Sequence, residues 1–351
     1  MSTLATNAIT DASGGNTATI NGYTPTVSNM AGRNRIINGD MRIDQRNAGA
    51  AVTATGSYPV DRFIVNNNTD GAFSAQQDSS APVGFTTSLK YTTTTADASV
   101  TGTKTSPIIQ VIEGLNCSDL AWGTANAQPV TLSFWVRSSL TGAFGGSLRN
   151  SDSSRSYPFS YSISAANTWE QKSVTIAGDT TGTWLTDNGS GIKVQFSMGS
   201  GPDRSGTAGV WNSNNNTSVT GAVSVISTLN ATFYITGVQL EAGSVATPFE
   251  HRMYGQELAL CQRYYEVGDH ISYFSTDVSG SFNPDAVYQT TFKVQKRAAA
   301  TMTTTNYVNL GSAVADGPSN PTAHGFRQSI EIAGGGSVGG HDYNWQASAE
   351  L

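Results

Sequence analysis

Charge is scarce in this sequence. Asp, Glu, Lys and Arg together make up 13% of its 351 residues, and the formal net charge is −6. Proteins that bind nucleic acid gather Lys and Arg on one face, where these side chains neutralise phosphates. The densest basic stretch here is KVQKR at 293–297, which is too short to form such a face. We therefore expect no nucleic-acid partner.

Cysteines and long apolar runs are also scarce. The two cysteines, Cys117 and Cys261, are far apart, and one pair in 351 residues forms no disulfide framework. We expect two free thiols and assembly in a reducing cytoplasm. No apolar run approaches the roughly 20 residues that span a bilayer, and the N-terminal stretch lacks the basic and apolar regions of a secretory signal. We therefore expect no membrane insertion.

Motifs for catalysis and metal binding are missing as well. No HExxH, CxxC, GxSxG, Walker or GxGxxG pattern occurs in its required context, and the four histidines stand singly at His251, His270, His324 and His341. We expect no catalytic residue, no cofactor and no zinc site. A structural calcium ion is left open, because segments 66–71 and 200–206 offer oxygen ligands, although neither has the spacing of an EF-hand loop.

A facing pair of carboxylates, as a glycosidase needs, cannot be recognised or excluded by sequence spacing. Five acids in expected loops or strand ends are candidates for such a pair: Glu113, Asp119, Asp152, Asp187 and Asp203. We interpret them as solvated loop acids, so the sequence favours a protein that is not an enzyme.

Gly, Ser, Thr and Asn are abundant, which suits short strands joined by tight turns. In VTLSFWVRSS, apolar residues from Val130 to Val136 alternate with polar ones, and GIKVQFSMGS at 191–200 alternates in the same way. In ATFYITGVQLE, Gly237 shifts the phase of the alternation, which predicts a β-bulge. Strands at this spacing without intervening helices predict an all-β protein, an antiparallel β-sandwich or jelly roll.

The chain divides into four predicted parts. Residues 1–33 lack any sustained periodicity and predict an extended arm, 34–250 form the sandwich, and 269–351 form a smaller C-terminal β-domain. Between them, 251–268 predict one linking α-helix. Its apolar stripe is expected to pack between domains or subunits, because so short a helix is unstable alone, and consists of Leu258, Cys261, Tyr264 and Tyr265.

Aromatic residues in polar surroundings are the candidates for ligand contact. Sugars stack their C–H faces on exposed aromatic rings while polar neighbours bind the hydroxyl groups. Trp135 and Arg137 fall on the polar face of their strand, and three further aromatic residues fall in or beside polar loops: Tyr157, Trp184 and Trp211. Each has a competing interpretation as a core residue, and Trp169 is expected to be one.

Two stretches carry a resemblance to a known family. NRIINGDMRIDQR at 34–46, followed by YPVDRF at 58–63, resembles the opening of bacteriophage tail-fibre and related virion proteins. The block at 232–267 resembles the best-marked region of that family. The matching positions are Glu241, Gly243, Pro248, Phe249, Glu250, Arg252, Glu257, Leu258, Cys261, Gln262, Arg263, Tyr264 and Tyr265. The middle of the chain resembles a carbohydrate-binding-module jelly roll.

The resemblance implies a virion protein of a bacteriophage, assembled in the host cytoplasm. It would be a tail-fibre or receptor-binding subunit, a homotrimer, that attaches to other virion proteins by its N-terminal arm and recognises host-surface polysaccharide through its β-sandwich. Two alternatives remain open: a purely structural fibre, head decoration or connector protein without a ligand, and a polysaccharide-degrading tailspike.

Overall fold

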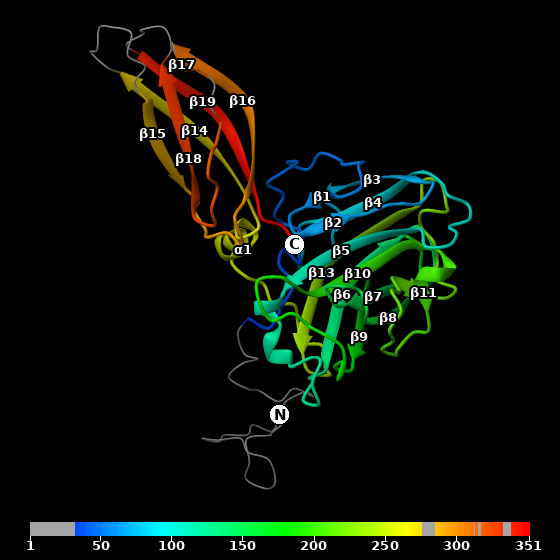
Figure 1. The fold of residues 1–351 in the computed structure, drawn as a ribbon. Coiled ribbons are helices and arrows are strands. Elements are labelled where there is room, and N and C mark those ends of the chain that lie inside the picture. Colours follow the sequence, from blue (N-terminus) through cyan, green and yellow to red (C-terminus); the bar gives the residue numbers. More distant parts are fainter. Residues whose placement is uncertain (1–31, 276–284, 312, 315–316, 333–337) are drawn as a thin grey trace, which may run out of the picture.

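The computed structural model describes residues 32–275, 285–311, 313–314, 317–332 and 338–351. Of the predicted arm, 1–33, all but the last two residues lie outside the described part. Figure 1 shows two bodies: a sandwich of strands and an elongated group of C-terminal strands, with the helix α1 where they meet. The described residues therefore form the predicted all-β architecture.

Two antiparallel sheets make the sandwich. The six-stranded sheet has the order β1-β2-β5-β10-β7-β8, and the strands are Ser57–Val60, Phe63–Val65, Thr105–Glu113, Ser190–Ser200, Gly142–Arg149 and Ser156–Ile163. The five-stranded sheet has the order β3-β4-β13-β6-β9, and its strands are Ala72–Asp78, Ser88–Thr95, Thr232–Ala242, Val130–Ser138 and Glu170–Ile176.

Short elements fill the connections. Three 3-10 helices, η1 to η3, cover Gly114–Asn116, Ser118–Leu120 and Pro202–Arg204, and a two-residue parallel pair joins β11 (Ser205–Gly206) to β12 (Ser218–Val219).

The sandwich core confirms the alternation predicted from sequence. Leu132, Phe134 and Val136 of β6 are fully buried between the sheets, whereas Trp135 and Arg137 point to the other face and are half-buried. The predicted bulge is also confirmed, because the pairing of β13 with β6 shifts register between Thr236 and Gln239. The face of the five-stranded sheet that points away from the core is called its outer face below.

The recognisable NGDMR stretch is packed against β13. Asn38 has a positive φ of 58°, and its amide group binds the backbone carbonyl groups of Ile43 and Asp61. A Cβ on Gly39 would lie 2.2 Å from the carbonyl oxygen of Val238, so only glycine allows this approach of the two backbones. The motif is therefore a packing motif.

The linking helix is shorter than predicted. Helix α1 covers Tyr254–Gln262, and Tyr265 already begins strand β14. Leu258 and Cys261 lie on the helix as predicted, but the prediction of a helix is wrong for Tyr264 and Tyr265, which follow its end. Backbone pairing of Tyr265 with Ser348 of β19 replaces the helical hydrogen bonds that the local pattern allowed.

The cluster around the helix still buries its apolar side chains. Cys261 and Tyr264 are fully buried with Ile37 and Ile43, and Leu258 packs at the edge of this cluster. Tyr265 is 5% exposed. Both cysteines of the chain are free and buried, as expected, and burial raises the pKa of the Cys117 thiol to about 12.

The C-terminal strands form two three-stranded antiparallel sheets. One has the order β14-β19-β16, with strands Tyr265–Ser275, Val338–Ser348 and Thr301–Gly311. The other has the order β15-β18-β17, with strands Asp285–Thr291, Gly325–Ile332 and Ala313–Val314. Their shared core is small and aromatic and consists of Phe292, Ala300, Phe326, Tyr343, Trp345 and Ala347. The expected alternation of Ile330 and Ile332 falls on side chains outside the described set.

Buried charges join the two bodies at what we call the junction. The Arg62 guanidinium lies over the ring of Tyr264 at 3.5 Å and pairs with Glu350, whose second oxygen accepts from Arg46 at 2.9 Å. Arg46 also pairs with the buried Asp61 at 3.1 Å. Desolvation raises the pKa of Asp61 to about 6, although Arg46 counteracts the shift. The junction is thus held by paired charges excluded from water.

Among the described residues, no helix has the length and apolar character needed to cross a membrane.

Candidate functional site

A hollow of about 650 Å³ lies on the outer face of the five-stranded sheet. We call it the pocket. Its floor is Trp135 of β6, which pairs with Thr236 of β13 on one side and with Gln171 of β9 on the other. Directly paired residues of antiparallel strands point to the same face, so Trp135 and Gln171 lie side by side. Ser173 of β9 extends this floor along the sheet edge.

Two chain segments form the side walls of the pocket. One is the turn before β4, where Val83 and Gly84 line the hollow and the Arg137 guanidinium donates to the Ser80 hydroxyl at 2.8 Å. The other is the segment after β13, from which Ala246, Thr247 and Pro248 line the hollow. This second wall is fixed because Thr131 and Thr175 donate to the backbone carbonyl groups of Gly243 and Ser244 at 2.9 and 3.0 Å.

Three rings close the back of the pocket over β13. Phe85 lies 5.2 Å from Phe249 and 5.4 Å from His251, measured between ring centroids, and the latter two are 4.9 Å apart. The bulge residue Gly237 lies beneath them with a φ of +61°. A Cβ there would be 2.7 Å from Phe85 and 3.1 Å from Trp135. The bulge and its glycine therefore allow the rings to meet the floor.

The polar side chains that face the pocket are neutral amides and hydroxyls, together with the imidazole of His251. Gln171, Ser173 and Thr247 offer donors and acceptors. Lys172 is paired with the core residue Phe134, so its side chain leaves the opposite face of β9, where it pairs with Glu170 at 2.6 Å. Among the described residues, none that lines the pocket carries a carboxylate. An aromatic floor with neutral polar groups can stack a sugar ring and bind its hydroxyl groups, but it offers no pair of acids for hydrolysis.

The five ligand candidates from the sequence fall in two places. Trp135 is the floor of the pocket. Arg137 lies beside it on the same strand face, but its guanidinium is engaged by Ser80 and lies over the ring of Tyr234 at 5.0 Å. We infer that Arg137 supports the wall of the pocket.

The other three candidates are gathered elsewhere around Trp122. Trp122, Trp184 and Trp211 contact one another edge to face with centroids 4.7 to 5.4 Å apart, and Tyr157 adds to the group at 5.2 Å from Trp211. The three indole N–H groups donate to backbone carbonyl groups of the protein itself. Their packing and hydrogen bonds are accounted for by the fold, and the structure does not bring them to the pocket.

The prediction that Trp169 is a core residue is wrong. The Trp169 side chain is only half-buried and packs edge to face on Tyr234, with centroids 6.1 Å apart, on the outer face. The core is already filled between the sheets by other rings, among them Phe134, Phe196 and Phe233.

Sequence reasoning missed Phe85, Phe249 and His251 as pocket residues. Phe85 and Phe249 are far apart in the chain, and only the pairing of β4 with β13 brings their neighbourhoods together. The one local signal was Gly237, because a glycine at a bulge often marks the close approach of other groups.

Four of the five acids considered for catalysis accept hydrogen bonds within the fold: Glu113, Asp119, Asp152 and Asp187. The interpretation as solvated loop acids is wrong for Glu113, which is buried at the end of β5. Glu113 is buried and accepts from Arg263 at 2.5 Å and from the Tyr264 hydroxyl at 2.6 Å, and these hydrogen bonds hold the pKa of Glu113 below its ordinary value despite burial. Asp119 pairs with Arg35 at 2.6 Å. Within the described part of the chain, no three His, Cys, Asp or Glu side chains are placed to hold a metal ion.

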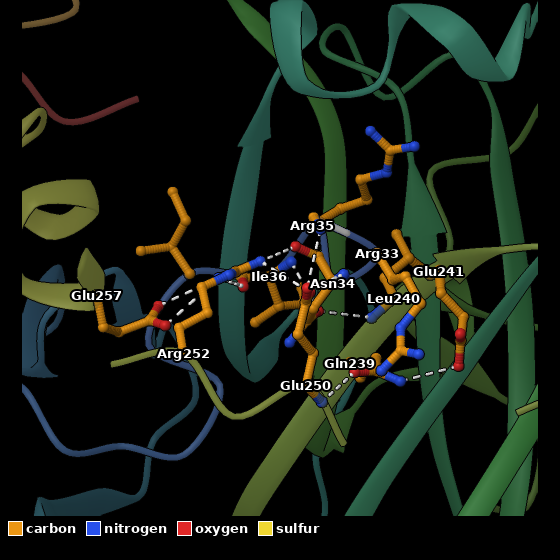
Figure 2. A network of polar contacts seen from close by, with 12 residues as sticks. Arg33, Asn34, Arg35, Ile36, Gln239, Leu240, Glu241, Glu250, Arg252 and Glu257 are labelled. Carbon is orange, nitrogen blue, oxygen red and sulfur yellow. Dashed lines mark hydrogen bonds and ion pairs between the residues drawn. The ribbon is translucent and has the colours of Figure 1, made fainter. Parts of the chain in front are cut away.

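The segment 248–252 has two faces, and the second face holds the N-terminal segment. Phe249 and His251 point to the pocket, whereas Glu250 accepts from the backbone N–H groups of Gly32 and Asn34 at 2.9 and 2.8 Å. Arg252 donates to the carbonyl of Asn34 and pairs with Glu257. Figure 2 shows these side chains converging between β13 and the segment around Asn34.

No protein-family model and no curated protein matches the chain. Among solved structures, the enzymatically active domain of bacteriophage CBA120 tailspike protein 4 is similar over 60% of this chain, with a TM-score of 0.33 at 12% identity. The match covers 21% of that tailspike chain.

Carbohydrate-binding modules are also similar. TmCBM61, solved with β-1,4-galactotriose, is 10% identical, with 60% of this chain and 99% of that chain covered and a TM-score of 0.30. The family 11 module of Lic26A-Cel5E from Clostridium thermocellum is 12% identical, with 59% and 100% covered and a TM-score of 0.28.

Proposed function

We propose that the chain is a fibre subunit of a bacteriophage particle and that it binds host-surface saccharide in the pocket at Trp135. The observation that carries the binding role is the aromatic floor and back of the pocket, flanked by the neutral polar groups of Gln171 and Ser173. Such surroundings match the two faces of a sugar, apolar C–H groups and hydroxyls.

The virion role is supported by the sequence blocks at 34–46, 58–63 and 232–267. In the same proposal, residues 1–33 attach the chain to other virion proteins, 34–250 present the pocket, and three copies form the fibre. Linking several weak sites raises avidity by about 10²–10⁴-fold without new contacts, so a trimer holds a cell even where one pocket binds weakly.

The test is a printed array of bacterial surface polysaccharides probed with the full chain and with Trp135→Ala. We expect binding to at least one polysaccharide and a loss of about tenfold or more in the variant, because a buried aromatic anchor usually dominates such an interface. Trp184→Ala is the matched control, since it removes an indole of the Trp122 group and leaves the pocket intact. Equal binding by Trp135→Ala would remove the pocket from the proposal.

A purely structural fibre is the alternative favoured by a separate observation. Most recognisable residues, among them Glu250, Arg252 and Tyr264, fasten the N-terminal segment, helix and junction, and only Pro248 and Phe249 line the pocket. A fibre that serves only as a spacer would bind no polysaccharide on the array, while its thermal stability would still depend on these residues.

A polysaccharide-degrading tailspike is the second alternative. It has less support, because no described residue that lines the pocket is an Asp or Glu. Release of reducing ends from a bound polysaccharide during incubation with the full chain would favour the enzyme over the binding protein.

A further inference from the structure

Along the surface of the sheet, the pocket ends at a contact of rings on one side and reaches the edge strand on the other. Its floor runs across β6, and the next strand outward, β9, is the edge of the five-stranded sheet. On the inner side stands the contact of Phe85 with Phe249 and His251 over β13. The two side walls are tied to opposite ends of the floor, at Arg137 and at the pair Thr131 and Thr175. A ligand therefore enters over Gln171 and Ser173 and meets the rings at the back.

This shape distinguishes two ways of binding a saccharide chain. A site for the interior of a polysaccharide needs two open ends, because the chain continues on both sides of the bound units. Here the path is blocked on the β13 side, where Phe85 comes from one wall and Phe249 from the other and their rings meet at 5.2 Å. An interior segment laid on Trp135 would have to displace this contact.

We propose that the pocket captures the terminal unit of a saccharide chain, with the rest of the chain leaving over the edge strand β9. This inference rests on the proposed saccharide binding and makes it more specific. Trp135 stacks the terminal ring, Phe85 acts as the end stop, and Gln171 and Ser173 contact the terminal unit and the next one outward.

The same geometry assigns a role to the bulge. Gly237 leaves the space into which Phe85 and Trp135 approach, since any Cβ at this position would lie within 3.1 Å of both side chains. The end stop therefore depends on the backbone of β13 as well as on the rings themselves.

The test compares chain ends with chain interiors at equal mass of sugar. The polysaccharides of the array are printed intact and after partial acid hydrolysis, and the full chain is applied to both. We expect binding per mass of sugar to rise about tenfold when chains of roughly 100 units are cut to roughly 10, because the local number of ends rises by that factor. Equal or weaker binding to the hydrolysed form, still dependent on Trp135, would overturn the end-capture proposal and keep saccharide binding.

A variant makes the test independent of the polysaccharide chosen. Phe85→Ala opens the back of the pocket, so the ratio of binding to hydrolysed and intact chains is expected to fall toward one. Leu229→Ala is the control, because Leu229 is an exposed apolar residue that does not line the pocket, and its loss leaves the back closed. An unchanged ratio in a folded Phe85→Ala protein would contradict the end stop. No binding to either form by the unmodified chain would instead reject the saccharide function itself.

Discussion

The pocket and the junction differ in the type of side chain that forms them and in their exposure to water. The pocket is half-exposed and aromatic, and none of the described residues that line it carries a carboxylate. The junction is excluded from water and consists of charges, with Arg62 enclosed by Glu350 and Tyr264. The recognisable sequence blocks contain most residues of the junction, whereas only two of their matching positions line the pocket. Most recognisable residues hold the fold together, whereas the pocket is lined mainly by residues outside the matching positions, with Pro248 and Phe249 as the exceptions.

Removing a junction charge is expected to have the largest effect. Arg62→Ala leaves the Glu350 carboxylate with Arg46 as its remaining charged partner and uncovers the Tyr264 ring, so the free energy of unfolding should fall by about 3–5 kcal/mol. Urea denaturation measures this loss. Lys104→Ala is the control, because Lys104 and its partner Asp70 pair at the surface, with side chains 33% and 76% exposed, and exposed pairs contribute about 0–1 kcal/mol. If Arg62→Ala also abolished saccharide binding in a folded protein, the separation of junction and pocket would not hold.

Substituting the bulge glycine, Gly237, should weaken saccharide binding more than it lowers stability, the reverse of what is expected for Arg62→Ala. Gly237→Ala adds backbone strain of about 1 kcal/mol at a positive φ and forces Phe85 and Trp135 apart, so binding should fall more than stability. Gly221→Ala is the matched control, since Gly221 has a φ of +79° with nothing within 4 Å of an added Cβ. Saccharide binding is measured on the array, and the melting temperature of each variant is measured beside it. Equal binding by the two variants would show that the space above Gly237 is not needed for binding.

The buried carboxyl of Asp61 at the junction should make the stability of the protein depend on pH. Burial raises the pKa of Asp61 from 3.8 to about 6, so the folded protein holds a proton that the unfolded chain releases in this range. The free energy of unfolding should therefore fall as pH rises from about 4 to about 6, by at most about 1.4 kcal/mol per pH unit. Asp61→Asn should lack this part of the slope. Identical pH profiles for the two proteins would contradict the raised pKa.

His270 should also make the free energy of unfolding depend on pH, with a smaller change than Asp61 and in the opposite direction. Burial and the nearby His341 lower the pKa of His270 below its ordinary value of 6.5, so the unfolded chain binds the proton more readily. The stability of the C-terminal sheets should then decline as pH falls below about 6.5. Hydrogen exchange of β14 and β19 in the unmodified chain and in His270→Gln checks this, and parallel profiles would remove His270 as the cause. The experiment separates the junction from the sheets attached to it.

Much of the sandwich could be predicted because its signal is local. Alternation in β6 and β10 reports which face of a strand is buried, and the phase shift at Gly237 reports the bulge. The helix end could not be predicted in this way. Residues through Tyr265 suit a helix locally, and the decision is made by pairing with Ser348, which lies far along the chain.

In the candidate site too, local sequence patterns predict some residues, whereas others depend on contacts between distant segments. Alternation along β6 places Trp135 on the outer face of the sheet, where the pocket lies. The polar neighbours of Tyr157 and Trp211 predict exposed rings, but Trp211 packs on Trp122 and Tyr157, and a backbone carbonyl accepts from the Trp211 indole. The closed back of the pocket was beyond reach, because two distant loops supply Phe85 and Phe249 and neither sequence shows that their rings meet.

The residues after β19 give the C-terminal sheets a second attachment. Arg297 donates to the carbonyl groups of Ala349 and Glu350 and, at 2.9 Å, to the carbonyl of Asn188 in the sandwich, and the Glu350 carboxylate pairs with Arg46 and Arg62. Strands β14 and β19 are neighbours in one sheet, so this sheet is fastened to the sandwich where it begins and where it returns. A body on a single tether can swivel, whereas one clamped at two adjacent strands acts as a lever. Force applied to its far end would reach the base as bending and torque.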